Sequence, residues 1–236
     1  KWYEYWKAAR TKWHQNLGLS TDLYRFHDHL KLAHYANAAC DIEYKFPMGF
    51  KELEGIHSRT DFDLKQHEQY SGKKLQFFDP ELNQSYVPYV IETSVGLDRM
   101  FLAVLSAAYQ EDQLPDGSER VVLKIPAVLA PYKAAILPLI KKDGLPEKAR
   151  EIMADLQLEY SLQYDEKDSI GKRYRRQDAI GTPYSITVDH QTLEDNTVTI
   201  RDRDTMEQQR VSLSELEQIL AKKASWKSVL SALRLQ

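Results

Sequence analysis

Cysteine is nearly absent from the 236-residue sequence, which contains only Cys40. A single cysteine excludes an internal disulfide and a cysteine-ligated metal cluster, and it fits a reducing compartment. We interpret Cys40 as a small buried residue. No apolar run approaches the roughly 20 residues of a membrane span, and the sequence opens in helical periodicity without a signal peptide. We therefore expect a cytoplasmic location and no contact with a membrane.

The sequence also lacks a strong excess of either charge. It has 32 basic and 35 acidic residues, so a nucleic-acid surface would have to be a local patch. GxGxxG, phosphate-loop, HExxH and CxxC patterns are all missing, which argues against the common nucleotide and zinc sites. His27, Asp28, His29 and His34 form a weak metal candidate, because side chains two residues apart on one helix diverge by roughly 160°. We expect surface or capping histidines there.

Hydrophobic periodicity predicts an α/β (α+β) protein. In the first half we expect helices over 2–17, 20–38, 60–72 and 97–109, and strands over 42–46, 50–57, 75–78 and 86–92. We expect Trp2 and Trp6 of the first helix to lie in the core. Thr60 and Asp63 resemble a capping box for the third of these helices. The period of two along 50–57 places Glu52 and Glu54 on one face of a strand.

Residues 111–120 (EDQLPDGSER) are the best candidate for a linker, because Pro115, Asp116-Gly117 and four acids interrupt regular structure. We therefore predict domains over 1–118 and 119–236. In the second domain we expect strands over 132–140, 158–164 and 184–189, helices over 146–157 and 169–180, and a hairpin over 196–211. Ser212 and Glu215 should cap a penultimate helix, and a last helix should run from Trp226 to Leu233.

The segment from Pro88 to Arg99 carries the clearest chemistry. A hydrophobic strand delivers Glu92 and Ser94 to its end, Gly96 allows close backbone approach, and Arg99 enters the next helix. A guanidinium can grip a phosphate, while a carboxylate and a hydroxyl can bind an ammonium or a metal ion. The simpler alternative is a strand-to-helix connection with an exposed arginine.

Residues 92–99 (ETSVGLDR) resemble motif 3 of class II aminoacyl-tRNA synthetases, in the form typical of the glycyl enzyme, EPSFGLGR or EPSAGVDR. Thr93 departs from the commoner proline. Residues 49–64 (GFKELEGIHSRTDFDL) are similar to that family's GxxELxGIxxRTDYDL segment. The opening KWYEYWKAARTKWH resembles its family-specific insertion.

This resemblance implies catalytic roles for Arg99 and Glu92. The implied ATP-binding residues are Glu52, Leu53, Gly96, Leu97, Asp98 and Arg99. The implied glycine-binding residues are Glu52, Glu92, Thr93, Ser94, Val95 and Gly96. ATP and its Mg²⁺ would be substrate, and whether Glu92 binds the glycine ammonium or that Mg²⁺ stays open.

A second resemblance covers the C-terminal half. Residues 129–139 (LAPYKAAILPL) and 170–183 (IGKRYRRQDAIGTP) are similar to the anticodon-binding domain shared by glycyl, histidyl, prolyl and threonyl enzymes. The implied tRNA-contacting residues are Lys172, Arg173, Tyr174, Arg175 and Arg176, which suit backbone gripping and base stacking. A solvated basic helix is the alternative.

Together the resemblances imply the C-terminal part of a glycyl-tRNA synthetase, that is, part of an antiparallel class II catalytic core followed by an α/β anticodon-binding domain with a mixed sheet. Such enzymes make glycyl-adenylate from glycine and ATP and transfer glycine to tRNA(Gly), and we expect a homodimeric full-length parent. Motifs 1 and 2 are not found, so we expect a fragment that is inactive alone. The alternatives are a non-catalytic nucleic-acid-binding module derived from a class II synthetase, and a histidyl or threonyl enzyme. Arg99, Glu52 and Glu92 favour the glycyl enzyme over both.

Overall fold

The computed structural model describes residues 1–232, and the chain divides into two compact units between Ser106 and Ala107. This division lies ahead of the predicted boundary at 118/119. The predicted linker is wrong, because β7 (Tyr109–Gln113) and β8 (Glu119–Leu123) pair as an antiparallel hairpin. The Asp116-Gly117 pair forms the tip of this hairpin, for which such a dipeptide is typical.

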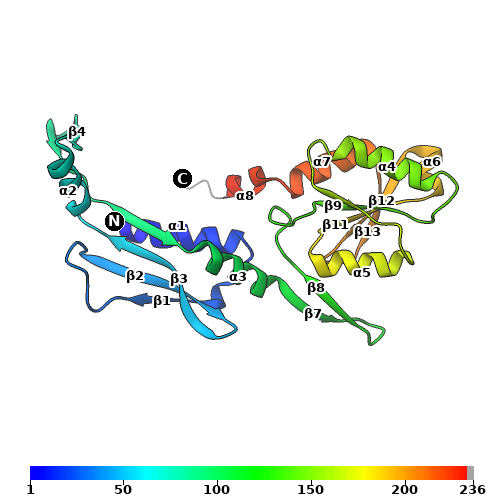
Figure 1. The fold of residues 1–236 in the computed structure, drawn as a ribbon, viewed down its shortest axis with the longest axis horizontal. Helices are drawn as coiled ribbons and strands as arrows, with labels where there is room; N and C mark the ends of the chain where they lie inside the picture. The colour runs from blue at the N-terminus through cyan, green and yellow to red at the C-terminus, as the bar shows by residue number, and fades with distance from the viewer. Residues whose placement is uncertain (233–236) are drawn as a thin grey trace. The chain divides into compact units, whose positions relative to one another are not determined.

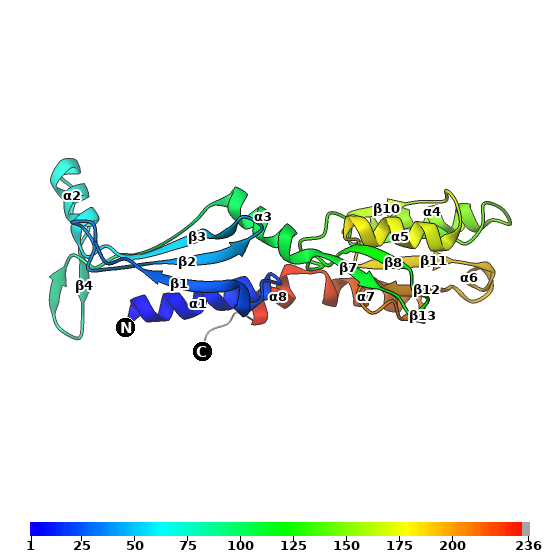
Figure 2. The ribbon, with the colours of Figure 1, turned by 90° about the horizontal axis from the view of Figure 1, so that it is seen from below.

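The first unit contains a four-stranded antiparallel sheet in the order β1-β2-β3-β6 (Figure 1). Its strands are β1 (Tyr24–Asp28), β2 (Ala38–Phe46), β3 (Gly49–Ser58) and β6 (Ile91–Val95). Helix α1 (Trp2–Asn16) runs along one face of this sheet (Figure 2). Cys40 is fully buried in the core of that face, as predicted. Trp2 and Trp6 were expected in the core but are 60% and 38% exposed.

The predicted helix over 20–38 is wrong. This segment forms a short 3-10 turn, η1 (Thr21–Leu23), and the edge strand β1, which pairs with β2. The apolar residues of this segment do not form one buried helical face, since Leu30 is fully exposed. Aromatic residues such as Tyr24 and Phe26 favour a pleated strand once a neighbouring strand is available. The argument against a metal site at His27 and His29 assumed a helix, so it no longer applies.

A β-bulge interrupts the alternation along β3. Glu54 pairs with Ile42, but Glu52 pairs with Glu43, so Leu53 is an extra residue. Directly paired residues share a sheet face and neighbours alternate, so Glu52 and Glu54 lie on opposite faces. The prediction that they share one face is wrong for this reason.

Glu54 lies on the α1 face and is completely buried. Its carboxylate accepts hydrogen bonds from Arg10, at 2.5 Å to Nε and 3.1 Å to Nη2, and lies 2.8 Å from His14 Nε2. Burial alone would raise the pKa of Glu54, but His14 and Arg10 outweigh it and hold the pKa below its ordinary value. The buried carboxylate therefore fastens α1 to the sheet.

The remaining elements of the first unit are α2 (Phe62–Ser71), β4 (Phe77–Asp79), β5 (Gln84–Tyr86) and α3 (Leu97–Ala108). Both predicted helices are present. The capping box at the start of α2 is not: the N-cap is Asp61, the Asp63 carboxylate binds Arg59, and the Thr60 hydroxyl donates to Tyr35 O.

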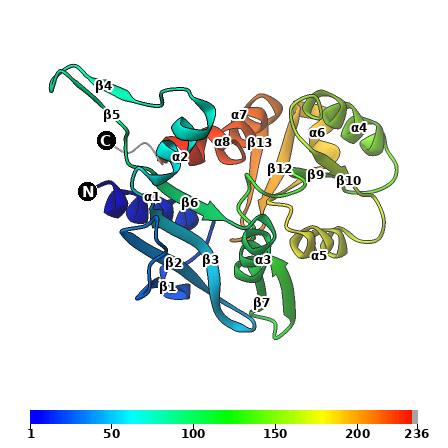
Figure 3. The same ribbon diagram turned by 60° about the vertical axis from the view of Figure 1, so that its left-hand side comes forward.

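The second unit has a five-stranded mixed sheet in the order β10-β9-β11-β12-β13. Strands β10 (Leu162–Tyr164), β9 (Ala134–Pro138) and β11 (Tyr184–Val188) are parallel, and β12 (Thr197–Asp202) and β13 (Gln208–Ser212) continue antiparallel. Helices α4 (Leu145–Leu156) and α5 (Ile170–Ile180) pack against β9, and α7 (Leu213–Lys223) packs against β13 (Figure 3). This confirms the predicted α/β class with its mixed sheet.

The ends of the C-terminal helices follow their capping residues. Ser212 and Glu215 form the predicted capping box of α7. Helix α6 (His190–Asp195) begins at a second capping box, formed by Asp189, and was not predicted. The last helix is α8 (Trp226–Ala232), and the predicted end at Leu233 lies outside the described residues. None of the helices within residues 1–232 has the length and apolar character of a membrane span.

Candidate functional site

The strand register separates the residues expected to bind glycine. Glu92 and Ser94 pair with His57 and Gly55 on β3, and these four residues share the sheet face opposite α1. Thr93 and Val95 alternate to the other face. Among residues 92–95, only the side chains of Glu92 and Ser94 can therefore act together on one ligand.

The bulge in β3 adds Glu52 to the same face, because its partner Glu43 lies there. We call this surface the front face. By register it carries Asp41, Glu43, Glu52, Gly55, His57, Glu92 and Ser94. With strict alternation along β3, Glu52 would share the face of Glu54 and point to the side of α1. The bulge thus places Glu52 on the same sheet face as Glu92 and Ser94.

Arg99, in the first turn of α3, lies beside Glu52. Its Nη1 donates to Glu52 O at 2.5 Å and lies 3.6 Å from the carboxylate oxygen Oε2. Both side chains are about half exposed, so both can reach a ligand. Leu97 and Asp98 are also exposed, but the side chain of Leu53 is buried, which leaves only its backbone for a ligand.

Arg59 orients Glu92, a role that the sequence analysis did not assign. Its Nη1 donates to Glu92 Oε2 at 2.6 Å, and its Nε donates to Asp63 Oδ2 at 2.6 Å. Its guanidinium lies 4.1 Å from the ring centroid of Tyr35. Asp63, and then Glu92, raise the pKa of Arg59 against the effect of burial. The only sequence signal for this role was the position of Arg59 at the start of the RTDFDL segment.

The structure removes Arg173 from the basic surface expected on α5. Arg173 is only 2% exposed, and its Nη1 and Nη2 donate to Pro138 O at 2.6 Å and Leu139 O at 3.1 Å. A buried guanidinium that satisfies backbone carbonyls cannot also grip a phosphate. Its role is to hold α5 against the end of β9.

The other four residues expected on that surface differ in availability. Arg176 is bound to Asp165, at 2.7 Å, and to Asp168, at 2.9 Å. Lys172 is exposed, and its side chain makes no ion pair or hydrogen bond with the described part of the chain. Arg175 is 44% exposed and lies 3.9 Å from Asp178. Lys172 and Arg175 are therefore the two cations best placed to meet a ligand.

Tyr174 lies between these cations at a pocket of about 390 Å³. Its hydroxyl bonds Thr187 Oγ1 at 2.7 Å, and the Arg201 guanidinium lies 4.8 Å from its ring centroid. The pocket lies between α5 and the β12–β13 hairpin and is lined by Gly171, Lys172, Tyr174, Arg175, Arg201, Met206 and Gln208. Arg201, Met206 and Gln208 were not predicted, because they are distant in the sequence from α5.

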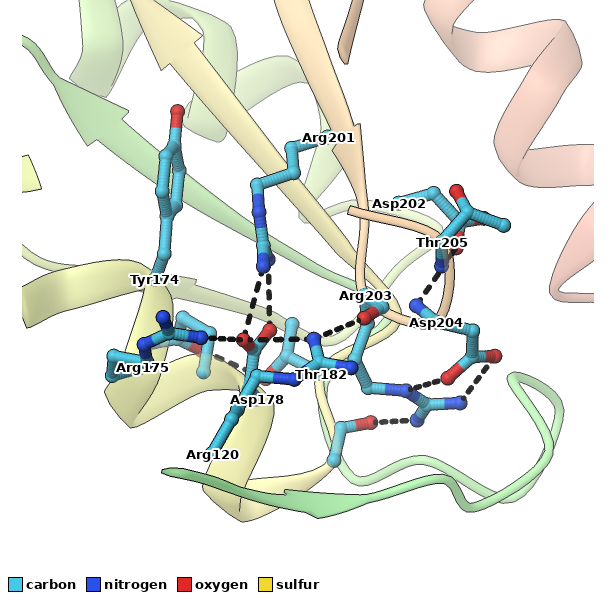
Figure 4. A network of polar contacts seen from close by, with 12 residues as sticks. Arg120, Tyr174, Arg175, Asp178, Thr182, Arg201, Asp202, Arg203, Asp204 and Thr205 are labelled. Atoms are coloured by element: carbon cyan, nitrogen blue, oxygen red, sulfur yellow. Dashed lines mark hydrogen bonds and ion pairs between the residues drawn. The ribbon is translucent and has the colours of Figure 1, made fainter. Parts of the chain in front are cut away.

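A buried network around Asp178 fixes the walls of this pocket (Figure 4). Arg201 donates to both carboxylate oxygens of Asp178, at 2.8 and 3.0 Å. Arg120 Nη1 on β8 donates to the same carboxylate at 3.2 Å and to Arg203 O at 2.7 Å. Burial would lower the pKa of Arg120, but Asp112 and Asp178 outweigh it and raise the pKa. One carboxylate therefore joins β8, α5 and β12.

Comparison with known proteins agrees with both resemblances. Residues 133–223 match the family model described as anticodon binding domain. The chain is 53% identical over 222 residues to the glycine–tRNA ligase of Chlorobaculum tepidum, covering 94% of this chain and 47% of that protein. It is 50% identical over 228 residues to the glycine–tRNA ligase of Geobacillus thermodenitrificans, covering 96% and 48%. The chain thus spans about half the length of these relatives.

Among solved structures, the fold is similar to the RNA binding domain of threonyl-tRNA synthetase from Cryptosporidium parvum, with a TM-score of 0.59 and 19% identity. The match covers 81% of this chain and 44% of that chain, and at this identity it shows the fold alone. The resemblance predicted from the sequence is confirmed: the chain is similar along nearly its whole length to the glycine–tRNA ligases, and its residues 133–223 match the anticodon binding domain.

Proposed function

We propose that this chain forms the C-terminal part of a glycine–tRNA ligase, and that the front face contributes to glycine activation. The observation that carries the proposal is that Glu52, Glu92 and Ser94 share the front face and that Arg99 lies beside Glu52. Glycine offers only an ammonium and a carboxylate, so its selection requires acidic partners and a confined space. Three polar side chains from two strands supply these partners.

In the proposed reaction, Glu92 binds the glycine ammonium. Arg59 occupies its Oε2, which leaves Oε1 for one hydrogen bond from the ammonium. Arg99 binds the triphosphate of ATP, which enters with Mg²⁺ as part of the substrate, and Gly96, Leu97 and Asp98 form the adjoining wall. Formation of glycyl-adenylate and transfer of glycine to tRNA(Gly) require positioning and charge stabilisation, and no protein nucleophile.

We propose that the second unit binds tRNA(Gly) at the α5 pocket. Lys172 and Arg175 supply positive charge, and Tyr174 supplies a ring beside them. Arg173 and Arg176 are not in this set, because carbonyls and carboxylates of the protein engage them. For the longer protein we propose a cytoplasmic homodimer.

The glycine site is tested by steady-state kinetics on the protein that contains this sequence. Glu92→Gln and Ser94→Ala should raise the KM for glycine and leave the KM for ATP nearly unchanged, because each removes an ammonium partner. Arg99→Ala should instead impair the ATP dependence of adenylate formation. Unchanged glycine KM values in both front-face variants would contradict the assignment.

The tRNA site is tested by affinity measured across a salt series. Lys172→Glu combined with Arg175→Glu should weaken tRNA binding and lower the salt slope by about 2, since each cation releases one counterion. Lys222→Glu on α7 reverses one charge away from the pocket and should leave the slope nearly unchanged. If the double variant on α5 and Lys222→Glu changed tRNA binding equally, the basic residues of α5 would be a solvated surface and not a binding site. Intact tRNA binding without any glycine activation would favour the non-catalytic alternative.

A further inference from the structure

The front face also brings together two histidines and an aspartate from different parts of the chain. His29 directly follows β1, Asp41 lies in β2 and His57 lies in β3. Each offers one ligand atom, and the three atoms lie within 4.8 Å of one another. From these residues we propose a site for a divalent transition metal, with Zn²⁺ as the best match. The proposal does not depend on the proposed function.

The backbone holds the three residues in register. His29 N donates to Ala39 O at 3.0 Å, so the pairing of β1 with β2 continues to the histidine. Ala39 in turn pairs with His57, and Asp41 pairs with Gly55, so all three side chains emerge on the front face. A site on paired strands is more rigid than one on loops, which lowers the ordering cost of metal binding.

The donor set suits zinc. His29 Nε2 lies 2.9 Å from Asp41 Oδ2, and the two imidazole rings are 5.8 Å apart. Ligand atoms on one tetrahedral zinc ion lie about 3.3 Å apart, because Zn–N and Zn–O bonds are about 2.0–2.1 Å. Small side-chain rotations would therefore bring all three atoms into range. Two imidazoles, one carboxylate and a water molecule form a common zinc environment.

An ordinary ion pair between His29 and Asp41 does not account for His57. Its Nδ1 is buried and has no hydrogen-bond partner among the described residues. The closest acid, Glu92 Oε2, lies 3.9 Å away and accepts from Arg59 at 2.6 Å. A buried imidazole nitrogen without a partner is costly unless a ligand satisfies it. A metal ion shared with His29 and Asp41 would do so.

Gly55 makes room for this arrangement. A Cβ at this position would lie 3.0 Å from His57 Cε1 and 3.7 Å from Asp41 Oδ1. The missing side chain therefore lets the imidazole lie across the strand toward the aspartate. Gly55→Ala should displace the ring and weaken the metal site without removing any ligand.

The test is titration of the chelator-treated 236-residue chain with Zn²⁺ by calorimetry, and with Co²⁺ by visible absorption. We expect one equivalent to bind, and His29→Ala or His57→Ala to weaken binding by at least ~100-fold, because the loss of outer-shell partners alone costs about 10–100-fold. Gly55→Ala should weaken binding by a smaller factor. Circular dichroism of each metal-free variant shows whether the fold is kept, and His57→Gln replaces His57→Ala if it is not.

The matched control is His190→Ala. His190 Nε2 lies 3.2 Å from Asp143 Oδ2 in the second unit, and no second histidine within residues 1–232 completes a metal-binding group there. Its loss should leave the affinity for Zn²⁺ unchanged. Absence of stoichiometric binding, a Co²⁺ spectrum of the free aqueous ion, or equal losses in the control and the His57 variant would each overturn the proposal.

Discussion

Removal of the Asp178 carboxylate should destabilise the second unit more than any surface charge change. Asp178 is completely buried, and its two principal partners, Arg120 and Arg201, are 1% and 5% exposed. Asp178→Ala would leave Arg201 without its ion-pair partner, while Arg120 would keep Asp112 and the carbonyl of Arg203. Breaking a buried pair from one side costs about 3–5 kcal/mol, because a desolvated charge stays behind.

The measurement is urea unfolding of the whole chain, with hydrogen exchange of amides in α5 and β12 to assign the affected transition to the second unit. Asp178→Asn keeps the hydrogen-bond acceptor and should lose less than Asp178→Ala. Glu151→Ala breaks an exposed pair with Lys148 on α4 and should cost less than about 1 kcal/mol. A loss for Asp178→Ala no greater than that of Glu151→Ala would refute the argument that this carboxylate joins three elements.

Three further predictions concern single positions. Because the pKa of Glu54 is lowered on folding, the stability that Glu54 contributes is present above the ordinary carboxyl pKa and is lost as the pH falls through the lowered value. Glu54→Gln should therefore have a lower free energy of unfolding at neutral pH. In pH-dependent urea unfolding, this variant should lose less stability on acidification than the unsubstituted chain. Gly181→Ala should cost about 1–3 kcal/mol by thermal or urea unfolding, since φ is +85° and the new Cβ would lie 2.8 Å from Ile125 Cγ2. Ser212→Ala should cost about 1 kcal/mol in the same assay, whereas Ser169→Ala should cost less because that N-cap side chain makes no capping bond.

The second unit could be predicted well from the sequence because each element has a local signal. Strands β9 and β11 are continuous buried runs, which is typical of the parallel part of a sheet. The α7 boundary followed from its capping box at Ser212. Local signals were insufficient where pairing with another strand decides the secondary structure. Strand β1 is an example, because its extended form depends on pairing with β2. Hairpin β7–β8 was mistaken for a linker because its polar turn residues are those of any loop.

The candidate site was predictable in its residue types but not in its geometry. The motif singled out Glu92, Ser94 and Arg99 in the sequence, yet it could not show that Arg59 orients Glu92 across 33 positions. On α5 the row of basic residues gave no indication of which ones face inward. Arg173 can be buried because it donates to backbone carbonyls at the end of β9. Those carbonyls become its neighbours only in the folded sheet.

The bulge at Leu53 explains how one strand can serve two opposite faces. With strict alternation, Glu52 and Glu54 would both point toward α1, and two carboxylates would compete there for Arg10 and His14. The extra residue keeps Glu54 on the α1 face, where it is fully paired, and turns Glu52 outward beside Arg99. Bulges are frequent beside active sites because they redirect a side chain without breaking the sheet. The stability of the α1 contact and the charge pattern of the front face therefore depend on the same inserted residue.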